Sequence, residues 1–399
     1  MSLKNLILRK FRSPYFVKEV KNSTYAAVIF SPLLFLAPLG SAVASEQVVD
    51  CPLRDQPYSI ESPLMDILLN PKAVEIVNRH MDGVLAKFPE SFASTKPPSL
   101  SAIITLDTVV SMGGHPKAVL APLDEELGAL VLGTADKQAR CARYDTVPPI
   151  LTLPEGKPRL LVFDKMNGFK DTPSVNAATA TITLLAERND WSLVTTANGA
   201  TFTPEILKKF DAVIWNNISG DVLTITQRQA FKDYINNGGG FVGIHGSGGD
   251  PKYFWDWYVD ELIGARFIGH TMNPQFQEAR VVVENTKTGI GRGLPPEWSI
   301  SDEWYSFKTS PRERGATIIA SLDESTYKQI GHGNQDLHMG DHPIAWTQCL
   351  ANGRSFYSAI GHRPEVYTDT NNIKLLEQGI AWAAGVGKST CRNGKEVSQ

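Results

Sequence analysis

Hydrophobic and polar positions change their spacing along the chain. From residue 159 onward, short apolar runs alternate with longer segments in which apolar residues recur every three or four positions. The short runs predict buried strands, at residues 160–163, 191–195, 212–215 and 241–244. The segments between them predict helices. Strands that alternate with helices through short turns are typical of a parallel sheet covered on both faces, so we predict a doubly wound α/β fold.

Local sequence signals predict where several of these helices begin. Thr172-Pro173 places a first-turn proline at the start of a helix that runs to about residue 186. Thr226 and Gln229 have the spacing of a capping box, which would open a second helix. Asp250-Pro251 has the form of an N-cap followed by a first-turn proline, so we expect a third helix to start there.

Residues 45–150 differ from this pattern, because their apolar positions have helical spacing without strand alternation. We predict helices at residues 63–69, 71–85, 100–110 and 123–132, with a fresh helix start at Asn70-Pro71. The region would form a helical accessory domain or a dimerisation or docking module, which leaves a homo-oligomer possible. Four prolines between residues 145 and 158 mark a linker, which we place at residues 151–157.

The last third of the chain has a less regular pattern. Strand candidates lie at residues 281–283, 317–320, 344–346 and 355–360, and a closing helix is expected at residues 371–384. We therefore predict an α/β domain at residues 158–386 and a loose polar tail at residues 387–399, which only Cys391 would tie down.

The N-terminus has the pattern of an export signal. A basic leader precedes an apolar run at residues 26–39 and the small residues Ala42-Val43-Ala44. This arrangement predicts a signal peptide at residues 1–44, cleaved after Ala44, and hence a periplasmic or secreted protein. The leader is longer than usual, so an uncleaved membrane anchor is the alternative. The apolar run is short for a bilayer span of roughly 20 residues, so we expect no integral span after cleavage.

Export makes disulfide bonds the expected state of the four cysteines. Four cysteines permit three pairings, and the absence of a C-x-x-C motif disfavours zinc or redox chemistry at these residues. Cys51 and Cys141 bracket one segment, whereas Cys349 and Cys391 lie near the end of another. We therefore favour the bridges Cys51–Cys141 and Cys349–Cys391.

Composition narrows the class of partner. The 399 residues are 42% hydrophobic and 20% charged, as in an ordinary globular protein, and the formal net charge is −3. The body of the chain has no long basic run. We therefore expect neither nucleic acid nor an anionic membrane as the main partner.

One glycine-rich turn is the candidate working centre. Residues 238–250 read GGGFVGIHGSGGD, a strand followed by a tight turn. In a parallel sheet this geometry lifts His245 above the carboxyl edge of the strands. Backbone N–H groups of residues 246–249 would converge beside it and stabilise an oxyanion or hold an anionic group. No Lys-Ser/Thr pair follows as in a P-loop, so we do not interpret the turn as a phosphate-binding loop.

Five sequence blocks resemble, in order, those of the ThuA-like (trehalose utilisation) family. They are GGFVGIHG at 239–246, GAxFxxH at 264–270, DEWY at 302–305, DHPIAW at 341–346 and GxxFYxxxGH at 353–362. The resemblance implies a flavodoxin-like sheet of the class I glutamine amidotransferase-like superfamily, here with a small N-terminal helical domain. It also implies a carbohydrate, such as an oxidised keto sugar, as the small-molecule partner.

Two departures from related sequences limit the chemistry. Family members often carry a histidine soon after the first strand, in a turn that here reads Gly168-Phe169-Lys170-Asp171, so Lys170 or Asp171 would line the cleft instead. Amidotransferase relatives carry a nucleophilic cysteine where this chain has His245, so the resemblance implies a nucleophile elbow that carries His245 in place of its nucleophile. No cysteine and no G-x-S-x-G motif occupies such a turn, so we expect no thiolate-dependent glutaminase chemistry.

Histidines and one carboxylate are the candidate catalytic residues. We predict that His245 and His362 transfer protons, because imidazole titrates near neutral pH, although His245 could instead bind backbone in a tight loop. Neighbouring strand residues point to opposite faces, so one of Asp302-Glu303 would face the cleft; we favour Glu303, with an exposed acidic loop as the alternative. The predicted substrate-binding residues are Gly246, Ser247, His270, His342, Lys170 and Asp171.

The sequence is compatible with more than one cofactor state and more than one function. We expect no established cofactor and keep a divalent metal as the alternative. A second polar cluster, His332, Asp336, His338 and Asp341, matches no standard zinc spacing, so we interpret it as a loop over the cleft. The chain is then either an exported protein that performs acid–base chemistry on a carbohydrate, or a non-catalytic sugar-binding or scaffold protein whose helical domain mediates assembly.

Overall fold

The computed structural model describes residues 49–113, 115–286, 289–387 and 389–398. The predicted signal peptide at residues 1–44 lies outside these residues. Among the described helices, none is both long and apolar enough to cross a membrane.

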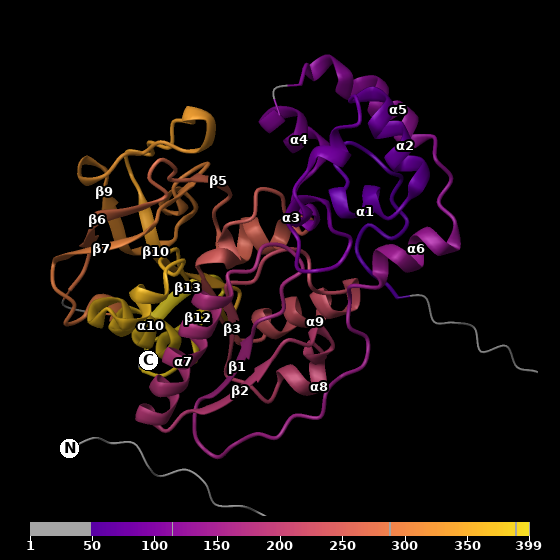
Figure 1. Cartoon of the computed structure of the whole chain (residues 1–399). Helices are drawn as coiled ribbons and strands as arrows, with labels where there is room; N and C mark the ends of the chain where they lie inside the picture. The colour runs from indigo at the N-terminus through magenta and orange to yellow at the C-terminus, as the bar shows by residue number, and fades with distance from the viewer. Residues whose placement is uncertain (1–48, 114, 287–288, 388, 399) are drawn as a thin grey trace, which may run out of the picture. The chain divides into compact units, whose positions relative to one another are not determined.

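A nine-stranded mixed sheet forms the centre of the α/β part, in the strand order β2-β1-β3-β4-β11-β10-β9-β6-β7. Figure 1 labels β1, β2 and β3 at one end of this order and β6, β7, β9 and β10 at the other. The five parallel strands are β2 (Ser192–Thr196), β1 (Arg159–Phe163), β3 (Ala212–Asn216), β4 (Gly240–Ile244) and β11 (Gly353–Ser358). The antiparallel half consists of β10 (Pro343–Leu350), β9 (Thr317–Asp323), β6 (Phe276–Val283) and β7 (Glu297–Glu303). The predicted α/β fold is confirmed, and the irregular final third proves to be the antiparallel extension of the same sheet.

Helices cover both faces of the parallel strands, which explains why β3 and β4 are buried throughout. In β3, Trp215 stacks on Phe231 of α9 (Ile225–Asn236), with ring centroids 5.6 Å apart. The side chain of the adjacent Asn216 points to the opposite face of the sheet, where its amide donates to the Val175 carbonyl of α7 (Thr172–Asn189). α10 (Thr370–Ala383) packs against α7, and the short α8 (Pro204–Leu207) packs against α9. The sheet is therefore doubly wound, as predicted.

Of two predicted helix starts, one is confirmed and the other is shifted by two residues. α7 begins at Thr172 as expected. α9 begins at Ile225, and its capping box is formed by Thr224 and Gln227, two residues before the predicted one. The prediction was wrong because Thr226 has a different partner: its N–H and hydroxyl both donate to Asp50.

Asp250 does not cap a helix, contrary to the prediction. Its buried carboxylate accepts hydrogen bonds from the Ser219 hydroxyl (2.5 Å) and the Gly220 N–H (2.7 Å). It therefore points back to the loop after β3 and ties two strand-end loops together. The next helix is a π-helix, η6 (Trp257–Ile263), which starts six residues after Pro251.

The N-terminal region is helical, as predicted. Its described α-helices are α1 (Leu64–Leu68), α2 (Pro71–His80), α3 (Glu90–Ala93), α4 (Leu106–Gly113), α5 (Leu120–Gly128) and α6 (Thr134–Cys141). Asn70 caps α2 by accepting from the Ala73 N–H (3.0 Å). The predicted helix at residues 100–110 is broken after a single 3₁₀ turn, and α6 was not predicted. These helices enclose an apolar core of their own, and their status as a separate domain stays a prediction.

Both predicted disulfides are present, Cys51–Cys141 and Cys349–Cys391. The second joins β10 to the C-terminal tail. That tail is a hairpin of β12 (Ser389–Arg392) and β13 (Lys395–Ser398), so the prediction of a loose tail was wrong.

The buried Asp250 predicts a pH-dependent stability. Burial raises the pKa of its carboxyl to about 7, although the Ser219 and Gly220 hydrogen bonds oppose this. The pKa of Asp250 in the unfolded chain is about 4. At pH values between about 4 and about 7, Asp250 is therefore protonated in the folded state and ionised in the unfolded state. The free energy of unfolding should therefore fall as pH rises through this range, by roughly 1 kcal/mol per pH unit.

Urea denaturation between pH 5 and pH 8 should show this slope in the wild type and a flatter one in Asp250→Asn. The amide mimics the protonated carboxyl, since it can donate to Ser219 and accept from Gly220. Asp256→Asn, at an exposed carboxylate, is the control and should keep the wild-type slope. Equal slopes in Asp250→Asn and the wild type would contradict the assignment.

Candidate functional site

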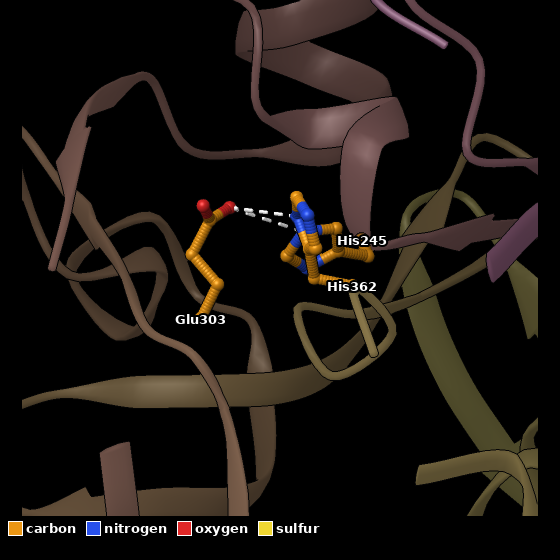
Figure 2. Close-up of side chains that lie close together, drawn as sticks. All are labelled: His245, Glu303 and His362. Atoms are coloured by element: carbon orange, nitrogen blue, oxygen red, sulfur yellow. Dashed lines mark hydrogen bonds and ion pairs between the residues drawn. The ribbon is translucent and has the colours of Figure 1, made fainter. Parts of the chain in front are cut away.

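The carboxyl ends of β4 and β11 bring two histidines together. The strands are parallel neighbours in which Ile244 pairs with Ser358, so the chains leave the sheet at the same edge. His245 follows β4 directly, and His362 lies in the loop after β11. Glu303 ends β7 and reaches both imidazoles from the opposite side (Figure 2). These three residues, predicted as the catalytic set, lie together in one cluster of side chains.

His245 occupies the predicted apex in a left-handed backbone conformation, with φ of +37°. Such a φ is uncommon and costly for a residue with a Cβ. The Nδ1 atom of the buried ring lies 2.7 Å from the Ala359 carbonyl, and the ring packs on Tyr305 with centroids 4.1 Å apart. Its Nε2 atom faces His362 Nδ1 at 3.3 Å and Glu303 Oε2 at 3.4 Å.

Glu303 is buried, and both of its oxygens have partners. Oε2 lies 3.1 Å from His362 Nδ1. Oε1 accepts from Gln275 Nε2 (2.5 Å) and lies 3.2 Å from His270 Nδ1. Burial alone would raise the pKa of Glu303, but the hydrogen bonds and charges of the surrounding histidines outweigh it and hold this pKa well below its usual range. Glu303 is therefore a fixed negative charge in the pocket.

His362 is the catalytic candidate nearest to the surface, with 15% of its side chain exposed. Burial lowers its pKa, but the hydrogen bond to Glu303 and the charges of Glu303, Asp302 and Asp171 have the larger combined effect and raise it above the ordinary value. The rings of Phe169 and Phe276 lie 6.1 Å and 5.2 Å from the imidazole, centroid to centroid.

Asp302 holds the loop that carries His362. Its buried carboxylate accepts from the backbone N–H groups of Gly361 (2.6 Å), His362 (3.3 Å) and Arg363 (3.0 Å). Burial raises the pKa of Asp302 despite these hydrogen bonds and the nearby His245. Adjacent carboxylates thus have different tasks: Glu303 faces the imidazoles, and Asp302 positions one of them.

In the glycine turn, groups that were expected to bind substrate form hydrogen bonds to other groups of the protein. The Gly246 N–H donates to Asn217 Oδ1 (3.2 Å), and the Gly249 N–H donates to the Gly246 carbonyl (3.1 Å). The buried Ser247 hydroxyl donates to the Trp215 carbonyl and accepts from the Ile218 N–H. A Cβ at Gly248 or Gly249 would collide with the ring of Tyr357 or Tyr305, so these positions need glycine for packing.

The other predicted binding residues separate into two groups. His270 lies beside Glu303 and is one-third exposed. Asp171 accepts from the Ser174 hydroxyl at the start of α7, near enough for its charge to act on His362, and Lys170 is exposed in the same turn. His342 belongs elsewhere: its buried ring contacts Glu324 (2.8 Å), the Tyr327 hydroxyl (3.0 Å) and the Tyr305 carbonyl (2.8 Å).

Among the described residues, one group of three metal-ligand side chains converges, and it is His245, Glu303 and His362. The second polar cluster does not assemble. Asp341 pairs with Arg312 and Ser310, and His338 pairs with Glu324. His332 and Asp336 are exposed. Gln275, Phe169 and Phe276 are the site residues that sequence reasoning missed; only Phe169 lay in a turn already singled out.

Residues 159–383 match the sequence model of the family described as ThuA, trehalose utilisation. The protein belongs to the ThuA family. The predicted resemblance to this family is thereby confirmed. No curated protein matches the chain.

Solved structures similar to this ThuA-family protein include two putative ThuA-like proteins. The one from Bacteroides uniformis is 26% identical and covers 56% of this chain and 90% of its own, with a TM-score of 0.48. The one from Parabacteroides merdae is 15% identical and covers 57% and 89%, with a TM-score of 0.41. A putative GMP synthase component from Thermoplasma acidophilum is 15% identical and covers 57% and 94%, with a TM-score of 0.32.

Replacing Asp302 by Asn should loosen the His362 loop. The amide presents one acceptor and one donor where three N–H groups need acceptors, so we expect a loss of about 1–3 kcal/mol in the free energy of unfolding. Urea denaturation measures it. Asp323→Asn, at a partly exposed carboxylate on β9, is the control and should change stability by less than about 0.5 kcal/mol. A wild-type stability for Asp302→Asn would refute the anchoring role.

Proposed function

We propose that this ThuA-family protein acts on a carbohydrate, such as a keto-sugar derivative, in the pocket of His245, Glu303 and His362. The observation that carries the proposal is a buried, ionised carboxylate held between two imidazoles at the carboxyl edge of the parallel strands. Ligands of open α/β sheets bind at this edge. The description of the family as trehalose utilisation supports a sugar as the substrate class.

The exposed side of His362 has a surface suited to a sugar ring. Phe169 and Phe276 are 46% and 40% exposed, and both lie against the His362 imidazole. Two exposed aromatic rings beside one imidazole form an apolar surface that a ligand could cover. Aromatic rings at a polar cleft can stack on the apolar face of a sugar while the polar groups bind its hydroxyls.

The chemistry that fits these groups is proton transfer. His362 and the partly exposed His270 are the imidazoles nearest to solvent, and Glu303 would stabilise positive charge on either of them. A keto sugar offers an acidic C–H next to its carbonyl, so isomerisation or elimination is the reaction class that this set would serve. His245 and Glu303 would hold the charge balance of the pocket during such a step.

We further propose that the protein works in the periplasm or outside the cell. Two disulfides support this location, because structural disulfides persist in oxidising compartments.

Replacement of Glu303 or His362 should strongly reduce turnover. In Glu303→Gln or His362→Gln, kcat/KM on a keto-sugar panel should fall at least about 100-fold, the usual contribution of a positioned acid–base group. His338→Gln is the matched control, because it removes an imidazole that also contacts a glutamate but lies outside the pocket. Binding without turnover in the wild type would instead favour a non-catalytic sugar-binding protein.

Truncation of the exposed ring should affect binding more than chemistry. Phe276→Ala removes a stacking surface that we assign to the sugar, so KM should rise about tenfold, equivalent to roughly 1.4 kcal/mol, with kcat within about twofold of the wild type. Val282→Ala, an exposed apolar truncation on the same strand, is the control and should leave KM unchanged. An unaltered KM in Phe276→Ala would place the sugar elsewhere.

A further inference from the structure

The hydrogen bond from His245 to Ala359 determines which nitrogen of its ring is free. A backbone carbonyl can only accept, so Nδ1 of His245 carries the proton in this 2.7 Å contact. Nε2 is therefore the ring nitrogen of His245 that faces the carboxylate oxygen of Glu303 and Nδ1 of His362. Three side-chain atoms of the kind that ligate metals thus face one another inside the protein.

The distances among these three atoms match a tetrahedral cation better than a shared proton. They are 3.1 Å, 3.3 Å and 3.4 Å. For ligands bound at about 2.0–2.1 Å, the edge of a tetrahedron is about 3.3–3.4 Å. A proton joins two atoms at about 2.7–3.2 Å, which accounts for one of the three contacts and leaves the other two long.

The surroundings of the three atoms resemble the outer shell of a metal site. Metal-binding histidines usually donate their second ring N–H to a carbonyl, as His245 does to Ala359. The outer oxygen of Glu303 is held by Gln275 and His270, which leaves Oε2 as a single ligand atom. Asp302 fixes the loop of His362 through the backbone.

We propose that His245 Nε2, Glu303 Oε2 and His362 Nδ1 bind one divalent cation of the zinc class, with a fourth position open to water or substrate. Two imidazoles and one carboxylate form a ligand set typical of catalytic zinc, whereas Mg²⁺ and Ca²⁺ prefer oxygen ligands. The open position would lie toward the more exposed side of the pocket, where His362 meets Phe169 and Phe276.

The inference rests on the proposed function in taking this pocket as the working site, and it deepens that function. A cation here would polarise a sugar carbonyl or hydroxyl, and its bound water would take over the proton exchange that the ion-free pocket leaves to the imidazoles. His270 touches only the outer oxygen of Glu303, so it stays available for proton transfer.

Metal analysis of the full chain, purified without a polyhistidine tag, tests the proposal. We expect about one Zn²⁺ per chain, removable by a chelator and restored in a calorimetric titration with ZnSO₄. In Glu303→Gln and His362→Gln the affinity should fall far more than tenfold, and in Gln275→Leu by about 10–100-fold, as for an outer-shell contact. His338→Gln should bind as the wild type does.

A spectroscopic measurement separates metal binding from misfolding. Co²⁺ in place of Zn²⁺ should give the intense visible band of tetrahedral coordination in the wild type and lose it in Glu303→Gln, while circular dichroism shows that the variant is folded. Absence of stoichiometric zinc, or full affinity in both ligand variants, would overturn the proposal. Zinc binding without sugar turnover would support the metal site and contradict the proposed function. Sugar turnover by metal-free protein would support the proposed function and contradict the metal site.

Discussion

The ionised carboxylate of Glu303 is the group on which the pocket depends. A buried carboxylate without partners is strongly unfavourable, so its charge persists only because compensating groups surround it. His362 and His245 approach one oxygen, and Gln275 and His270 approach the other. These groups come from separate segments of the chain. The carboxylate therefore makes the positions of these segments interdependent, and it makes positive charge or a cation the natural occupant of the space between the imidazoles.

The topology of the sheet makes this convergence possible. β4 and β11 are parallel neighbours, which places His245 and His362 at the same edge. β7 lies at the far end of the antiparallel half, yet its last residue, Glu303, contacts both histidines. The antiparallel strands must therefore curve back over the carboxyl edge of the parallel ones. One half of the sheet supplies the imidazoles and the other supplies the carboxylate, so the pocket exists only when both halves have formed.

Much of this arrangement was predictable where local signals and tertiary structure agree. Apolar runs placed β1 to β4, Thr172 marked the start of α7, and the bracketing cysteines indicated both disulfides. Local signals failed where a distant partner competed for the same side chain. Thr226 has a capping sequence but binds Asp50, and Asp250 precedes a proline but binds Ser219 and Gly220.

Within the site, the histidines could be predicted because they end recognisable strands, but their partners could not. Gln275 lies in an irregular turn before β6, and nothing in its neighbourhood indicates a contact with Glu303. The exposure of Phe169 and Phe276 is equally a tertiary property, since an aromatic residue is more often part of a core. His342 illustrates the converse: its motif is as prominent as that of His362, yet Glu324 and Tyr327 bind its ring away from the pocket.

The strained turn at His245 determines where its imidazole points. A left-handed residue at the end of a strand projects its side chain toward the edge where substrates bind. A nucleophile in that place needs backbone donors nearby for an oxyanion. Here the Gly246 N–H is bound to Asn217, and Gly248 and Gly249 lie under tyrosine rings. The turn has kept the geometry that presents a side chain and has used its neighbouring groups for packing. What remains at the apex is an imidazole nitrogen that faces the Glu303 carboxylate.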